Sequence, residues 1–349
     1  MLTAGRALAS DEPFDPYLAV MSLLGVTLCV LALQSRRSSS AKVVVTDPIV
    51  PAPKPTICCP GGGVYFWWQI GALKRLLELY ELPKEIHLAG ASAGALSVCL
   101  AQCSVDPMKA YRLAYQLAED SDVFTNPLGL CGKWGRLVHA WLDEMLPEDA
   151  AARCSGRCRI IVTRCFDSPR VLRADAVESF QSKEDLINSL MASTHLPFFM
   201  DGRPFSKRLG GTTTDGALLG FIGVHSIRSL LVPEPADHAG AVILSHLKDE
   251  AFMEACRLNG WKPISAVGTE NFMSFGARWV EREAARGTSG ELASLVAYRR
   301  RRPWRDTVSS THDPLCGGEL PGKLAANKQS HTTRRPRRSP LRKLNDPQH

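Results

Sequence analysis

The chain has 349 residues, of which 45% are hydrophobic and 22% are charged, a composition typical of a globular protein with a sizeable core. Its formal net charge of +7 comes from the C-terminal end, where residues 323–349 hold eight lysines and arginines and one aspartate. The rest of the chain holds 34 basic and 34 acidic residues and is therefore neutral. This distribution gives no support to nucleic-acid binding by the protein as a whole.

An uncharged, mostly apolar run at residues 17–33 follows the polar residues 1–16 and precedes Arg36 and Arg37. As a helix the run would be about 25 Å long, against about 30 Å for the hydrocarbon core of a bilayer. The basic residues on its C-terminal side favour a single transmembrane anchor with the rest of the chain in the cytosol. A cleavable signal peptide fits less well, because its basic residues would precede the apolar run. A buried core helix is the remaining alternative.

Residues 34–54 are rich in proline and serine and are interpreted as a linker before a folded domain at residues 55–298. Apolar patterning predicts strands at 56–59, 86–89, 159–163 and 241–244, and helices after residue 63 and at 95–103, 107–119, 137–145, 185–192 and 248–258. Strands that alternate with helices predict an α/β fold with a mainly parallel central sheet flanked by helices. Residues 299–349 are basic and lack periodicity, which predicts a disordered tail that is either simply solvated or in contact with anionic lipid.

The sequence contains eleven cysteines, and several of them lie inside apolar runs, where they are interpreted as small hydrophobic residues. Cys154 and Cys158 are separated by three residues, but no neighbouring pair of cysteines or histidines completes a zinc set. We therefore expect no metal site, and we expect reduced thiols in a reducing compartment.

The segment Gly90-Ala91-Ser92-Ala93-Gly94 lies between a predicted strand and a helix of small residues. Strand, tight turn and helix form the context of a nucleophile elbow, in which the serine hydroxyl is presented above the start of the helix. Glycines on either side of such a turn allow one backbone to pack closely against another. The alternative is a tight turn with an inert serine.

Two further motifs accompany the elbow, Gly61-Gly62-Gly63 after the first predicted strand and Asp215-Gly216-Ala217 after a Gly/Thr-rich turn. Glycine amides near a helix start can approach a ligand and stabilise negative charge. A serine needs a base to accept its proton, and histidine is the usual base. The most conspicuous histidines lie in no catalytic motif and are interpreted as structural or surface residues: His87, His195 and His225. A carboxylate can serve instead when burial raises its pKa.

These three motifs, in this order, resemble those of the patatin-like phospholipase family. Residues 185–197 also resemble the helix-to-proline segment that precedes the catalytic aspartate of the family, so the similarity extends from residue 55 to about residue 245. The resemblance implies a three-layer fold and a Ser-Asp dyad, with Ser92 as nucleophile, Asp215 as base and the glycine triplet as oxyanion hole. It implies hydrolysis of a lipid ester without a metal or organic cofactor, and the predicted anchor would keep the site beside a substrate in the bilayer. Phospholipid, galactolipid and triacylglycerol all remain open as substrates.

One departure from the family pattern lies directly after the glycine triplet. The family usually has a basic residue and a glycine where this chain has Tyr65 and Phe66. Phe66 with Trp67 and Trp68 would either add apolar surface near the site or pack in the core. The altered loop leaves a catalytically inactive lipid-binding or scaffolding protein as the alternative function. An α/β-hydrolase with a Ser-His-Asp triad fits less well, because only about forty residues separate the linker from the elbow.

Overall fold

A computed structural model describes residues 55–125, 131–166, 171–232, 234–258 and 266–300. The strands are β1 Thr56–Cys59, β2 His87–Ala91, β3 Cys158–Cys165, β4 Leu172–Val177, β5 Thr213–Thr214 and β6 Ala241–Ile243. The helices are α2 Phe66–Leu79, α3 Ala93–Gln102, α4 Pro107–Asp120, α5 Trp134–Met145, α6 Ala150–Cys154, α7 Lys183–Ser193, α8 Leu218–Phe221, α9 Ile227–Leu231, α10 Glu250–Leu258 and α11 Ala266–Ala285. Short 3₁₀ turns are η1 Gly63–Tyr65, η2 Pro235–Gly240, η3 His246–Lys248, η4 Gly287–Ser289 and η5 Ala293–Tyr298.

The sheet has the strand order β4-β3-β2-β1-β6, and β5 pairs with β3 beside this path. Strands β1, β2, β3 and β6 are parallel, whereas β4 and β5 run antiparallel to β3. The predicted α/β fold with a mainly parallel sheet is therefore confirmed. The strand predicted at 86–89 lies slightly further along the chain, and it ends directly before Ser92.

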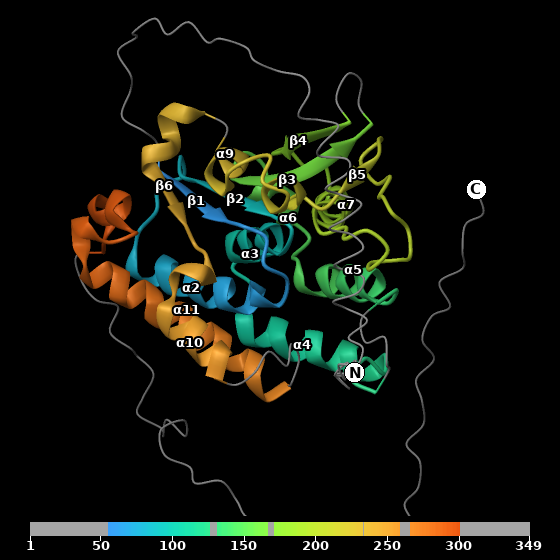
Figure 1. Cartoon of the computed structure of the whole chain (residues 1–349), viewed down its shortest axis with the longest axis horizontal. Helices are drawn as coiled ribbons and strands as arrows, with labels where there is room; N and C mark the ends of the chain where they lie inside the picture. Colours follow the sequence, from blue (N-terminus) through green and yellow to red (C-terminus); the bar gives the residue numbers. More distant parts are fainter. Residues whose placement is uncertain (1–54, 126–130, 167–170, 233, 259–265, 301–349) are drawn as a thin grey trace, which may run out of the picture. The chain divides into compact units, whose positions relative to one another are not determined.

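Helices cover both faces of the sheet, but unequally (Figure 1). The larger core packs one face of the sheet against α2, α3, α5, α7 and α11. On the opposite face, side chains such as Ala89 and Ile161 pack against Leu219, Leu230 and Leu231, which come from the short helices α8 and α9. The layers expected from the sequence are present, and the second outer layer is thin.

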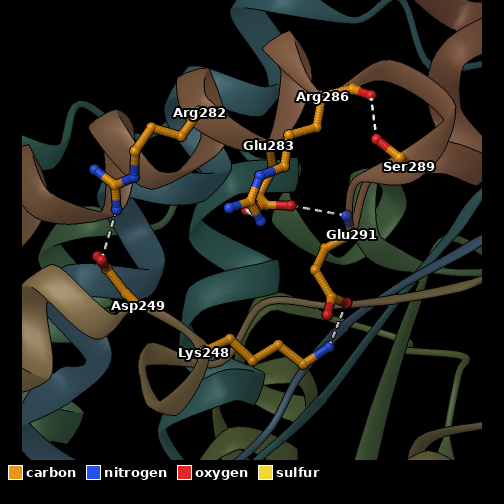
Figure 2. Close-up of polar contacts among 7 residues, drawn as sticks. All are labelled: Lys248, Asp249, Arg282, Glu283, Arg286, Ser289 and Glu291. Carbon is orange, nitrogen blue, oxygen red and sulfur yellow. Dashed lines mark hydrogen bonds and ion pairs between the residues drawn. The ribbon is translucent and has the colours of Figure 1, made fainter.

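The segment that follows β6 completes the domain by packing along α2. Asp249 is fully buried between these elements, where it accepts hydrogen bonds from the Trp68 indole at 2.9 Å and the Arg282 guanidinium at 2.6 Å. Figure 2 shows this ion pair beside a second one between Lys248 and Glu291. A buried carboxylate without such partners would destabilise the fold. Because Trp68 lies on α2 and Arg282 lies on α11, their hydrogen bonds to Asp249 hold the two helices together.

Six helices and strands of the fold are absent from the sequence prediction: α6, α8, α9, α11, β4 and β5. Of these, α6 and β5 fall in stretches that were expected to be irregular or turn-like. In contrast, α4 begins as predicted, because the Asp106 side chain accepts a hydrogen bond from the Lys109 amide at 2.7 Å and proline occupies the first turn.

Among the described residues, no helix is both long enough and apolar enough to cross a membrane. The predicted anchor at residues 17–33 and the linker at 34–54 lie outside the described residues, as does most of the tail predicted at 299–349. The expected membrane segment therefore stays a prediction from the sequence.

Candidate active site

Strand β3 brings Ser92 and Asp215 to the same level of the sheet. One edge of β3 pairs with β4, so β2 and β5 share the other edge. The last residue of β2 pairs with the residue of β3 directly before Val162, and the last residue of β5 pairs with the residue of β3 directly after Val162. Because β2 and β5 run in opposite directions, the residues that follow them, Ser92 and Asp215, meet at the level of Val162.

Ser92 occupies a strained turn between β2 and α3, with φ 53° and ψ −128°. Positive φ is uncommon for residues other than glycine and is typical of a nucleophile elbow. The two flanking glycines are required by close packing of the backbone. A Cβ on Gly94 would lie 1.8 Å from the carbonyl oxygen of Cys59, and a Cβ on Gly90 would lie 2.4 Å from that of Gly94. The elbow predicted from the sequence is therefore present as a local geometry.

The strained backbone of Ser92 is held from a distant helix. The Ser92 amide donates a hydrogen bond to Ser193 Oγ at 2.9 Å, and the Ser193 hydroxyl donates to the Ile161 carbonyl at 2.6 Å. Ala91 and Ala93, which flank Ser92, are both buried, so this segment has little freedom to move. Ser193 thus links the elbow to β3 through two hydrogen bonds.

The same end of α7 also holds the aspartate segment. The Asp215 amide donates to the His195 carbonyl at 3.0 Å, and the Gly216 amide donates to the Ser193 carbonyl at 2.8 Å. A Cβ on Gly216 would lie 1.9 Å from the Ile161 carbonyl oxygen, so only glycine fits at this position. The backbone just after α7 therefore positions both candidate catalytic segments.

Asp215 is buried and lies in direct contact with the partly exposed Ser92. The Ser92 hydroxyl donates a hydrogen bond of 2.6 Å to Asp215 Oδ2, while Oδ1 accepts from the Ala217 amide at 2.9 Å. Burial raises the pKa of the Asp215 carboxyl from 3.8 to about 6, against the opposing effect of these two hydrogen bonds. A carboxylate with this pKa is a better proton acceptor at neutral pH than an exposed aspartate.

Gly61, the first glycine of the triplet, lies against Ser92 and Ala217, and Gly62 lies against His246. A Cβ on Gly61 would lie 2.5 Å from the Cβ of Ala217 and 3.3 Å from the Cβ of Ser92. A Cβ on Gly62 would lie 3.5 Å from the ring of His246. Within the described part of the chain, the amides of the triplet donate no hydrogen bond to another group.

The residues after the triplet pack into the core rather than adding open apolar surface. Tyr65 stacks on His246 with ring centroids 4.0 Å apart, and Phe66 lies edge-on to Trp141. Phe66 and Trp68 are buried, so the core explanation of this departure is the correct one for these two side chains. Gly63 opens the 3₁₀ turn η1 with φ 54°, a conformation that favours glycine.

No histidine in the described residues hydrogen-bonds the Ser92 hydroxyl or the Asp215 carboxylate. The His195 ring instead faces the Arg203 carbonyl, and only its backbone contributes to the site. Sequence reasoning missed the roles of Ser193 and His246 in supporting the site. His246 follows β6, just as the glycine triplet follows β1. Because neighbouring parallel strands end at the same edge of the sheet, the position of His246 shortly after a predicted strand is the one sequence signal that it lies near the triplet.

Burial lowers the pKa of His246 to about 4, so its ring is neutral at physiological pH. Its Nδ1 atom is buried and has no hydrogen-bond partner among the described residues. The ring therefore shapes the glycine loop by packing, without adding a positive charge beside it.

Replacing Ser193 with alanine is expected to lower kcat about 10- to 100-fold with little change in KM, because the elbow loses the group that holds its amide. It also leaves a buried amide and a buried carbonyl without a partner, at a cost of about 1–3 kcal/mol in stability. Ser189→Ala is the matched control, since this buried serine on α7 bonds only the Asp185 carbonyl of its own helix. Equal kcat values in ester hydrolysis for the two variants would contradict a positioning role for Ser193.

Fold and site together define an α/β protein in which a serine on a strained strand-to-helix turn contacts a buried carboxylate. Residues 57–227 match the family model described as Patatin-like phospholipase, and this segment of the chain belongs to that family.

Three curated relatives are similar to parts of this chain. The mouse omega-hydroxyceramide transacylase is 31% identical over 156 residues, covering 44% of this chain and 25% of the relative. The human protein of the same name is 31% identical over 177 residues, covering 50% and 32%. Rat patatin-like phospholipase domain-containing protein 2 is 26% identical over 182 residues, covering 50% and 35%. The chain thus matches between a quarter and about a third of the length of these relatives.

Proposed function

We propose that the domain cleaves the carboxylic ester of a lipid through an acyl-enzyme on Ser92. The observation that carries this proposal is the 2.6 Å hydrogen bond from the Ser92 hydroxyl to the buried Asp215 carboxylate. The strained elbow, which presents the hydroxyl while Asp215 stays buried, supports it further. An inactive scaffolding protein would not require this strain, which costs about 1–3 kcal/mol at such a position.

In the first step, Ser92 Oγ attacks the ester carbonyl carbon while its proton passes to Asp215 Oδ2. The tetrahedral oxyanion is stabilised by amides of the glycine triplet, and each well-placed donor lowers the barrier by about 3–4 kcal/mol. Collapse of this intermediate breaks the ester bond, and the leaving alcohol takes the proton from Asp215. The acyl group is then bonded to Ser92.

In the second step, an acceptor hydroxyl attacks the acyl carbon and gives its proton to Asp215. The bond from the acyl carbon to Ser92 Oγ then breaks, Asp215 returns the proton to Oγ, and the acyl group leaves on the acceptor. Water as acceptor makes the enzyme a hydrolase, and a lipid alcohol makes it a transacylase. The names of the relatives include both a transacylase and a phospholipase-domain protein. Analysis of the reaction products therefore decides whether water or a lipid alcohol is the acceptor.

Covalent labelling tests the nucleophile directly. The purified full chain is treated with a fluorophosphonate probe, and the labelled peptide is identified by mass spectrometry. We expect label on Ser92, none on Ser92→Ala, and normal labelling of Ser104→Ala. Ser104 is the matched control, since it also has positive φ, at 56°, but is exposed and makes no contact with Asp215. Equal labelling of wild type and Ser92→Ala would exclude Ser92 as the nucleophile.

The pH profile tests the base. Because Asp215 must be ionised to accept the serine proton and its pKa is about 6, kcat/KM is expected to fall about tenfold per pH unit below that value. Above pH 7 the profile should be flat. Initial rates with a neutral ester between pH 4 and pH 9 provide the measurement, and an inflection at the pKa of an exposed aspartate would contradict the assignment.

We further propose, from the sequence, that residues 17–33 anchor the protein in a membrane with its domain in the cytosol. The expected result is that the full chain sediments with membranes and needs detergent for release, whereas a chain lacking residues 1–54 is released without it. Release of both by alkaline carbonate would count against the anchor.

A further inference from the structure

Two pairs of cysteines that are distant in the sequence converge in the interior. One pair comes from α3 and its C-cap, and the other from the end of α6 and the first residue of β3. All are at most 4% exposed. We call this group the thiol cluster, and its members are Cys99, Cys103, Cys154 and Cys158.

The sulfur atoms of the thiol cluster lie close together. The Sγ atoms of Cys99, Cys154 and Cys158 all lie within 4.8 Å of one another. The Sγ atom of Cys103 lies 3.7 Å from that of Cys154. Four thiolates at about 2.3 Å from a tetrahedral zinc ion lie about 3.8 Å apart, so the separations among Cys99, Cys154 and Cys158 need less than about 1 Å of adjustment. Cys103 is already at a suitable distance from Cys154, and its side chain must turn toward the other two sulfurs to become the fourth ligand.

The sequence spacing within each pair also suits a metal. Three residues separate Cys99 from Cys103, and three separate Cys154 from Cys158, within the usual range for paired zinc ligands. Residues four apart on a helix lie on the same face, which places the first pair toward the second. Sequence reasoning found the pair at 154 and 158 without a partner, because the second pair lies some fifty residues earlier in the chain.

The surrounding charges complement an anionic centre. Arg157 directly precedes Cys158, its charge acts on that thiol, and its buried Nε has no hydrogen-bond partner among the described residues. The Arg153 guanidinium donates to the Cys103 carbonyl at 3.3 Å. A divalent ion held by four thiolates carries a net charge of −2, which the nearby Arg157 guanidinium and the Arg153 guanidinium, itself paired with Asp149 at 2.9 Å, would partly balance.

We propose that the thiol cluster binds one Zn²⁺ ion as a closed structural site. On binding, each thiol loses its proton to solvent and its sulfur donates an electron pair to the ion, with no change of oxidation state. All positions around the ion are occupied by protein, so the site has no open position for a substrate.

The ion would join two elements that position the candidate active site. Helix α3 begins directly after Ser92, and β3 provides the Ile161 carbonyl to which Ser193 is bonded. A cross-link between the far end of α3 and the start of β3 therefore stabilises the scaffold of the elbow from the side opposite the substrate.

Metal binding is tested on the full chain after purification under reducing conditions and removal of metal by a chelator. Cd²⁺ is added as the probe, because its bond to thiolate gives a charge-transfer absorption in the ultraviolet. Zn²⁺ is then measured by competition and by elemental analysis. The variants are Cys99→Ala, which keeps a small apolar side chain in α3, and the double variant Cys154→Ser with Cys158→Ser.

Cys165→Ser is the matched control. This cysteine is equally buried on β3, but it lies seven residues from Cys158, about 23 Å along the strand. Circular dichroism of every variant reports whether it has folded.

We expect the wild type and Cys165→Ser to bind about one equivalent of either ion and to lose thermal stability when it is removed. Folded Cys99→Ala should bind zinc at least about tenfold more weakly, and the double variant should give no saturating absorption. Equal binding by the wild type and these variants would overturn the proposal. So would the absence of saturable binding in the folded wild type, or a Cys103–Cys154 disulfide in the chain kept under reducing conditions.

Discussion

Replacing Asp215 with asparagine is expected to lower kcat for ester cleavage at least about 10³-fold, as loss of a member of a catalytic serine dyad does. Asparagine has nearly the same shape as aspartate, and its amide oxygen can still accept a hydrogen bond from the Ser92 hydroxyl. It cannot take up the proton, so the hydroxyl stays a weak nucleophile. The Ser92→Ala variant should be at least as inactive, and the double variant should lose no more than either single variant.

The same substitution is expected to stabilise the fold at neutral pH. Because burial raises the folded-state pKa of Asp215 above its unfolded value, the ionised form is the one that costs stability. The cost appears as pH rises from about 4 to about 6 and is complete above that range. A rise of about two in the pKa of Asp215 corresponds to about 3 kcal/mol of destabilisation of the wild type at neutral pH. The stability gained by the asparagine variant is smaller than this, because asparagine makes weaker hydrogen bonds.

Thermal unfolding of Asp215→Asn and wild type at pH 4 and pH 7.5 measures this effect. The difference in Tm should favour the variant at pH 7.5 and shrink at pH 4, where the wild-type carboxyl is protonated. Asp201→Asn, which changes an exposed aspartate on a nearby loop, should alter neither kcat nor this pH dependence. A variant that is inactive but less stable at both pH values would indicate a structural defect instead of a missing base.

The parts of the site that were predictable from the sequence are those whose geometry is local. The elbow is recognisable because Gly90 and Gly94 must lie at fixed positions around a strand-to-helix turn, and close packing excludes any Cβ there. Helix α4 is recognisable because a capping aspartate and a proline act within one turn. In both cases the physical requirement involves neighbouring residues and leaves a pattern in the sequence.

The parts that were missed depend on residues far apart in the chain. Strand β5 has only two residues, and it exists because the edge of β3 beyond β2 is open for pairing. Ser193 was part of a recognised segment, but nothing in that segment indicates that its hydroxyl reaches the amide of Ser92, 101 positions earlier. The thiol cluster is similar, because each pair is visible in the sequence but their proximity is not.

Replacing Gly61 with alanine is expected to lower kcat about 10²- to 10³-fold, the effect of losing one oxyanion donor. The new Cβ would lie 2.5 Å from the Cβ of Ala217 and 3.3 Å from that of Ser92, closer than side chains pack. Since both neighbours belong to buried, hydrogen-bonded segments, the glycine loop must move away from the dyad. Its amides would then no longer reach the oxyanion.

Gly63→Ala separates this effect from a general disturbance of the loop. A Cβ at Gly63 meets no atom within 4 Å, but the residue has φ 54°, so alanine there costs about 1 kcal/mol in stability without entering the site. Both variants should retain the Ser92–Asp215 contact and react with a fluorophosphonate probe, the Gly61 variant much more slowly. If Gly63→Ala lost as much kcat as Gly61→Ala at equal stability, backbone strain in the loop, and not contact with the dyad, would be the cause. A normal kcat for Gly61→Ala would place the oxyanion donors elsewhere, at the amides that begin α3.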